Sequence, residues 1–199
     1  MTVFFTRCCR RLARHDSALL RGALVALWLA MAAVLPAHAQ GIEIRKAGVT
    51  IAEDAYVLDA QFDIALTHTL EDVLNKGVPL YFLLEFELIR SRWYWFNDRV
   101  SSWQQQHRLS YNALTRQYRL GVGNLYQNYS SLAEALEVMS RVRRRHEIEP
   151  GTLRRDTTYS AALRFRLDTS QLPKPFQLNA VGSREWYVGS DWLRWNVTP

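Results

Sequence analysis

Cysteine is almost absent from this chain of 199 residues, and both copies lie near its beginning, at Cys8 and Cys9. Everything after residue 9 therefore lacks a thiol. This excludes from that part of the chain a disulfide, a thiol nucleophile and any metal or iron–sulfur site that cysteine ligates. A domain built there must depend on its hydrophobic core, and about 160 residues suffice for one domain with a sizeable core.

Histidine is also scarce, and local catalytic motifs are missing. Beyond residue 39 only His68, His107 and His146 occur, and no pair has the H-x-x-x-H or H-x-H spacing of a metal site. The chain contains no G-x-S-x-G elbow, no phosphate-binding glycine loop and no dinucleotide fingerprint. We therefore predict no cofactor, no metal and no catalytic residue. A hydrolase would need a site that only the fold assembles.

The first 39 residues have the pattern of a secretory signal peptide. Five arginines precede the uncharged apolar run Gly22–Leu35, and Ala37-His38-Ala39 supplies the small residues that a signal peptidase requires. As a helix the run spans about 21 Å, which is shorter than the ~30 Å hydrocarbon core of a membrane. We predict cleavage after Ala39 and export to the periplasm or cell envelope. The alternative is a retained anchor, which would be the only contact with the membrane.

The net charge changes when this segment is set aside. The whole chain holds 25 Lys+Arg and 19 Asp+Glu, a formal charge of +6. Residues 1–39 account for five arginines and one aspartate, so 20 basic and 18 acidic residues remain, a balance of +2. Most of the basic character therefore belongs to the signal, and we predict no nucleic-acid partner.

The segment Pro79–Phe96 is the centre of the predicted fold. Leu84, Phe86 and Leu88 lie on one face of an extended chain, and Glu85 and Glu87 lie on the other. This alternation is typical of a strand with one buried face and one solvated face. We expect this strand to occupy the middle of an antiparallel sheet.

Other segments complete a mainly β pattern. Strands are predicted in residues 42–51, 56–66, 103–113, 118–122, 157–168 and 191–198, with a hairpin turn at 113–116. One short helix is predicted between the N-cap Thr69 and Gly77. The segment Pro173-Lys174-Pro175 is interpreted as a rigid extended connector. These elements predict one domain over residues 40–199, an antiparallel β-sandwich with two short helices.

The second predicted helix begins with the capping box Ser131-Leu132-Ala133-Glu134 and is expected to end in a cluster of cations. The arginines of this cluster are Arg141, Arg143, Arg144 and Arg145. Cations at the C-terminus of a helix complement its dipole, so the cluster has a structural interpretation. The functional alternative is a patch that binds an acidic partner or an anionic membrane surface.

Aromatic residues gather after the central strand, at Trp93, Tyr94, Trp95 and Trp103. Exposed rings of this kind stack on sugars or on peptide. The alternative is that they fill the core of the sandwich. Trp93 and Trp95 share one face of an extended chain, so Tyr94 lies on the other face. Aromatic rings then lie on both faces, and the two faces cannot both be exposed to solvent.

Three stretches carry a family resemblance: L-D-A-Q-F-D-I-A-L at 58–66, L-E-D-V-L-N-K-G-V-P-L-Y-F at 70–82 and W-L-R-W at 192–195. Together with the basic signal that ends in A-x-A, they resemble the exported proteobacterial family called domain of unknown function (DUF) 4390. The resemblance covers nearly all of the chain after the signal. It implies a periplasmic or envelope location, and it implies no catalytic residue because the family has no established activity.

These observations favour an exported, non-enzymatic accessory module that binds another envelope protein. The candidate binding residues are Arg141, Arg143, Arg144, Arg145, Trp93, Tyr94, Trp95 and Trp103. A second hypothesis is a carbohydrate- or peptidoglycan-binding module that uses Trp93, Tyr94 and Trp95 as a stacking platform. A hydrolase with a fold-assembled site is the third.

Overall fold

Strands dominate the structure, a computed structural model that describes residues 41–51, 55–90, 98–147, 152–154, 157–180 and 183–198. The predicted signal peptide, and with it the question of an anchor, lies outside the described residues, as do Trp93, Tyr94 and Trp95. The described residues belong to one compact unit, Gln40–Pro199. In chain order its elements are β1 (Gly41–Ile51), β2 (Ala55–Ala65), α2 (His68–Asn75), β3 (Leu80–Arg90), β4 (Asp98–Asn112), β5 (Gln117–Val122), β6 (Leu125–Tyr129), α3 (Leu132–Met139), β7 (Arg141–Glu147), β8 (Tyr159–Leu167), α4 (Lys174–Ala180) and β9 (Leu193–Val197), with short 3-10 turns at Thr169–Gln171 and Arg184–Trp186.

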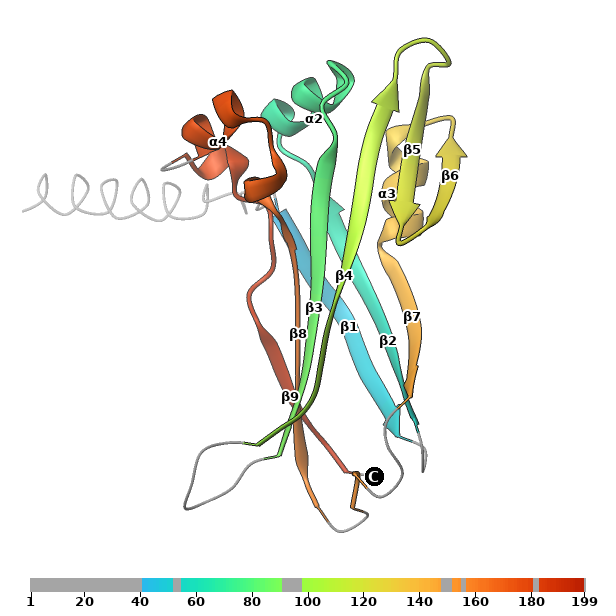
Figure 1. Cartoon of the computed structure of the whole chain (residues 1–199), viewed down its shortest axis with the longest axis vertical. Helices are drawn as coiled ribbons and strands as arrows, with labels where there is room; N and C mark the ends of the chain where they lie inside the picture. Colours follow the sequence, from blue (N-terminus) through green and yellow to red (C-terminus); the bar gives the residue numbers. More distant parts are fainter. Residues whose placement is uncertain are drawn as a thin grey trace, which may run out of the picture. The chain divides into compact units, whose positions relative to one another are not determined.

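The strands form two antiparallel sheets (Figure 1). The smaller has the order β1-β2-β7, and the larger has the order β6-β5-β4-β3-β8-β9. The mainly β prediction is confirmed, and so is the interior position of β3, which pairs with β4 on one side and β8 on the other. The predicted hairpin is also present, because β4 and β5 pair around the turn at 113–116.

Aromatic rings from the two sheets contact each other in the core. The Tyr56 ring of β2 lies 5.2 Å from the Phe86 ring of β3, and the Phe62 ring of β2 lies 5.0 Å from the Phe165 ring of β8. Leu84, Phe86 and Leu88 of β3 are fully buried, as their alternation predicts. Burying one such side chain contributes about 1.5–3 kcal/mol, so this face of β3 is a main source of stability.

The helices differ from the prediction. The described residues contain three α-helices, and the third, α4, occupies the segment interpreted as an extended connector. Proline is compatible with the first turn of a helix, where no intrahelical donor is needed, so Pro173 and Pro175 can precede and begin α4. Helix α2 also begins earlier than expected: Thr67 is the N-cap, and its Oγ1 accepts from the Leu70 N–H at 3.3 Å.

The arginine cluster belongs to a strand, which corrects the prediction that it ends a helix. Helix α3 stops at Met139, and the next residues form β7, which pairs with β2. The N-cap is confirmed, because the Glu134 N–H donates to Ser131 Oγ at 3.2 Å, while the Glu134 carboxylate accepts from the Ser130 N–H at 3.2 Å, one residue before the position that a capping box predicts. Strand β7 forms hydrogen bonds with the edge of β2, and no local pattern in the sequence indicates this pairing. The explanation of the arginines by a helix dipole is therefore wrong.

Candidate functional site

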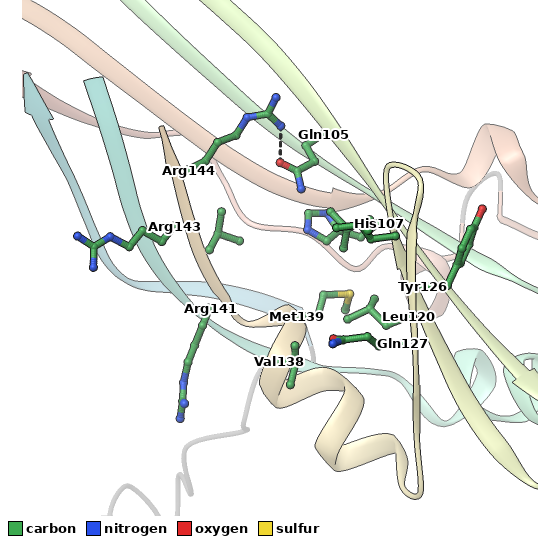
Figure 2. Close-up of a pocket in the computed structure, with 13 residues that line it drawn as sticks. Gln105, His107, Leu120, Tyr126, Gln127, Val138, Met139, Arg141, Arg143 and Arg144 are labelled. Carbon is green, nitrogen blue, oxygen red and sulfur yellow. Dashed lines mark hydrogen bonds between the residues drawn. The ribbon is translucent and has the colours of Figure 1, made fainter. Parts of the chain in front are cut away.

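A cleft of about 560 Å³ lies where the larger sheet extends past the edge of the smaller one (Figure 2). Strands β4, β5 and β6 form one wall, and β7 with the end of α3 forms the other. Its apolar lining residues are Leu120, Val122, Leu125, Val138, Met139 and Val142. Its polar lining residues are Gln105, His107, Tyr126, Gln127, Arg141, Arg143 and Arg144.

Local structure explains how the chain builds this cleft. At Gly123, with φ 59°, the chain turns between β5 and β6 in a conformation that favours glycine. Helix α3 then carries the chain from the larger sheet to the smaller, and it buries Ala135 and Met139. A Cβ atom at Gly121 would lie 2.6 Å from the Tyr126 ring, so only glycine allows Tyr126 to lie this close to β5.

Arg144 is the only one of the four candidate arginines that is half-buried rather than exposed. It donates a hydrogen bond to Gln105 Oε1, and its guanidinium carbon lies 4.6 Å from the centre of the Trp103 ring. These contacts join two candidates, Arg144 and Trp103, that are far apart in sequence. Each is worth about 1 kcal/mol in a partly desolvated setting.

Trp103 is packed on its other side as well. Its ring stacks on Phe86 at 5.7 Å, and its indole N–H donates to Tyr56 Oη at 2.8 Å. The same phenol lies 3.1 Å from Ser101 Oγ. Trp103 is therefore held between the sheets by ring contacts and a hydrogen bond, in the arrangement that the core-filling interpretation describes.

His107 is a buried polar residue in the wall of the cleft. His107 is 3% exposed, and its Nδ1 has no hydrogen-bond partner among the described residues. Burial lowers the pKa of His107 from 6.5 to about 4, and the charge of Arg144 acts in the same direction. A hydrogen bond with the backbone of Gln105 opposes this lowering of the pKa. The imidazole is therefore neutral near pH 7 and keeps an unused polar atom beside the cleft.

The other three arginines of the cluster, Arg141, Arg143 and Arg145, are exposed. Arg141 donates to Glu137 Oε1 at 2.8 Å, an exposed i,i+4 contact that contributes little to stability. The alternation of β7 thus separates the cluster into one arginine between the sheets and three on the outside. Sequence reasoning found the cluster but missed His107 and Gln105, although both lie on the buried face of the alternating segment that became β4.

A second polar cluster surrounds Glu85, which was predicted to be solvated and is 7% exposed. Arg164 Nη2 lies 2.6 Å and Arg166 Nε lies 3.0 Å from its Oε2, and Gln104 Nε2 donates to its Oε1 at 3.3 Å. Arginines on the neighbouring strand cover the carboxylate, which the alternation of β3 alone cannot indicate. Because these groups satisfy each other, the cluster is a closed structural network.

In the described part of the chain, no three potential ligands among His, Cys, Asp and Glu lie close enough together to hold a metal ion. No helix within the same residues is long and apolar enough to cross a membrane.

Comparison with known proteins identifies the family. No curated protein matches the chain, and no solved structure matches it. One family model, described as a domain of unknown function (DUF4390), matches residues 39–196. This match covers most of the chain and includes all three stretches that carry the resemblance. The chain is therefore a member of the DUF4390 family.

Proposed function

We propose that this protein is an exported, non-enzymatic accessory protein of the periplasm or cell envelope that binds another envelope protein in the cleft. The observation that carries the proposal is the exposure of apolar side chains beside cations. Leu125 is 78% exposed and Val138 is 44% exposed, and both line the cleft with Arg144. Apolar side chains that remain exposed together and are bordered by polar groups are typical of an interaction site.

The chemistry of the walls supports binding. Among the described residues, the polar groups that line the cleft are guanidinium, imidazole, amide and phenol groups, with no carboxylate or aliphatic hydroxyl. A cationic and apolar wall attracts a ligand with acidic and apolar groups. General acid–base chemistry instead uses a titratable group with a pKa near the working pH, and burial moves His107 away from that range.

We also infer that the two sheets form a β-sandwich and that residues 40–199 are one exported domain. The ring contacts of Tyr56 with Phe86 and of Phe62 with Phe165 support face-to-face packing of the sheets. The basic, apolar and A-x-A pattern of residues 1–39 supports export. In this arrangement the core holds the cleft walls in place, and export brings the cleft to its partner.

Site-specific photo-crosslinking in living cells tests the binding proposal. A photoreactive phenylalanine derivative at Leu125 would report on the cleft. The same derivative at Leu114, which is 96% exposed on the turn after β4, is the matched control. We expect a discrete adduct with one envelope protein at Leu125 and none at Leu114, and we expect Val138→Glu, at an exposed lining residue, to abolish it. Equal labelling at both positions, or no adduct at Leu125, would overturn the proposal.

A further inference from the structure

We propose that the partner supplies an extended segment of alternating acidic and apolar residues, which adds to β7 as a fourth strand of the smaller sheet. This inference deepens the proposed function and rests on it. Three observations carry it: the hydrogen-bonding edge of β7, the unequal size of the two sheets and the charges along that edge.

The main chain of β7 has an open edge among the described residues, because β7 is the last strand in the order β1-β2-β7. The Phe62 N–H donates to the Ser140 carbonyl at 2.8 Å. Opposed residues in an antiparallel pair alternate between bonded and non-bonded pairs. Val142 and Arg144 therefore bond to β2, whereas the main-chain N–H and C=O groups of Arg141 and Arg143 point away from it. These groups are a template for strand addition.

The cleft lies where a fourth strand would lie. The larger sheet continues past β4 into β5 and β6, while β7 is the last strand of the smaller sheet in the part of the chain that the structure describes. The faces of β5 and β6 that line the cleft carry Val122, which is half-buried, and Leu125, which is exposed, and no described strand of the smaller sheet covers them; Leu120 beside them is already buried. A strand paired with β7 would place every second side chain over these residues. This position requires apolar side chains on one face of the incoming segment.

The opposite face of the added strand would meet cations. Arg143 points outward, and its side chain would flank the outward side chains of a neighbouring strand; Arg141 points the same way but already bonds to Glu137. Acidic residues at these positions match the charge, whereas lysine or arginine would be repelled. The required pattern therefore has a period of two residues, with acidic groups outside and apolar groups inside.

A peptide-binding experiment with the purified protein tests the inference. The probe is a fluorescein-labelled peptide of alternating glutamate and valine, about eight residues long to match β7. We expect saturable binding by fluorescence anisotropy, and affinity at least about tenfold lower for a peptide with lysine in place of glutamate. Equal binding of both peptides would overturn the charge argument. Binding to anionic phospholipid vesicles but not to the acidic peptide would replace the partner strand with a membrane surface.

Two substitutions at one position separate the main chain from the charge. Arg143→Gln removes the cation, whereas Arg143→Pro also removes an N–H that points away from β2 and leaves the pairing with β2 intact. We expect the proline variant to bind at least about tenfold more weakly than the glutamine variant. Arg108→Gln, an exposed change on the other face of β4, is the control and should bind normally. Equal affinities of the two Arg143 variants would refute strand addition.

Hydrogen exchange gives a test that does not depend on any variant folding. In the wild-type protein the amide of Arg143 should exchange quickly and become protected when the peptide binds. The amide of Val142 already bonds to β2, so it should be protected with and without peptide. Peptide binding that leaves Arg143 unprotected would overturn the inference. If no peptide binds but the crosslink at Leu125 persists, this inference fails alone; if that crosslink is also absent, the proposed function fails with it.

Discussion

Acidification should destabilise the folded protein through His107. Burial lowers the pKa of this imidazole from 6.5 to about 4 in the folded state. Between these pH values the unfolded chain binds a proton at this position that the folded protein does not bind. The stability contributed by neutral His107 is therefore fully present above about pH 6.5, and it is lost as the pH falls toward 4.

The size of this effect follows from the pKa difference. One pKa unit corresponds to about 1.4 kcal/mol, so the full loss is about 3 kcal/mol, of which about 2 kcal/mol is lost between about pH 7 and pH 5. For a domain of this length, 2 kcal/mol corresponds to a fall of about 5 °C in Tm. His107 is 3% exposed, so solvent screening does little to reduce the effect.

Thermal unfolding at several pH values, followed by tryptophan fluorescence, measures this loss. Other groups also titrate in this range, so the informative quantity is the difference between the wild type and His107→Leu. We expect the leucine variant to lose about 5 °C less than the wild type between about pH 7 and pH 5. His68→Gln, a change at an exposed histidine beside Asp72, is measured alongside as the comparison for removal of an imidazole. Parallel curves for the wild type and His107→Leu would refute the reasoning.

Three further changes test the core, the arginine cluster and the Glu85 network. Leu84→Asp places a charge on the fully buried face of β3 and should prevent folding, so a soluble variant with native circular dichroism would contradict that register. Arg144→Ser should cost about 1–2 kcal/mol in chemical denaturation because it removes the contacts with Gln105 and Trp103, whereas Arg143→Ser should cost much less; equal losses would contradict the split of the cluster. Glu85→Ala should cost about 3 kcal/mol in the same assay, because two partly buried arginines lose their shared carboxylate, and a loss below about 1 kcal/mol would argue against the network.

Local periodicity predicted the strands that bury one face. Strand β2 was predicted from alternation that spans nearly its whole length, and β3 and β8 were predicted from alternation over part of theirs, Leu84–Leu88 and Leu163–Leu167; β3 was placed correctly in the interior of a sheet. Strand β6 was missed because all but the last of its residues are exposed, so it has no buried face to mark it. Strand β7 was assigned to a helix because arginine is a good helix former and the preceding segment is helical.

The candidate site was predicted in part. The arginines of β7 were recognised as a possible binding patch, and three of them are exposed. Their role at the end of a helix was wrong, since the strand depends on the edge of β2, which lies far away in sequence. The burial of His107 beside Arg144 was not predicted, because it requires β4 and β7 to approach from different sheets.

The sequence by itself determined which residues alternate, where helix α3 begins and which chemistries lack their residues. These properties depend on neighbours along the chain. Successive side chains of a strand point to opposite faces, and a capping side chain contacts backbone groups only a few residues away. Only the tertiary structure decided that β7 is the outermost described strand of the smaller sheet, that Arg144 lies between the sheets and that Glu85 is covered by arginines. Those outcomes depend on which edges and faces meet, and residues far apart in sequence supply the hydrogen bonds and the burial that stabilise them.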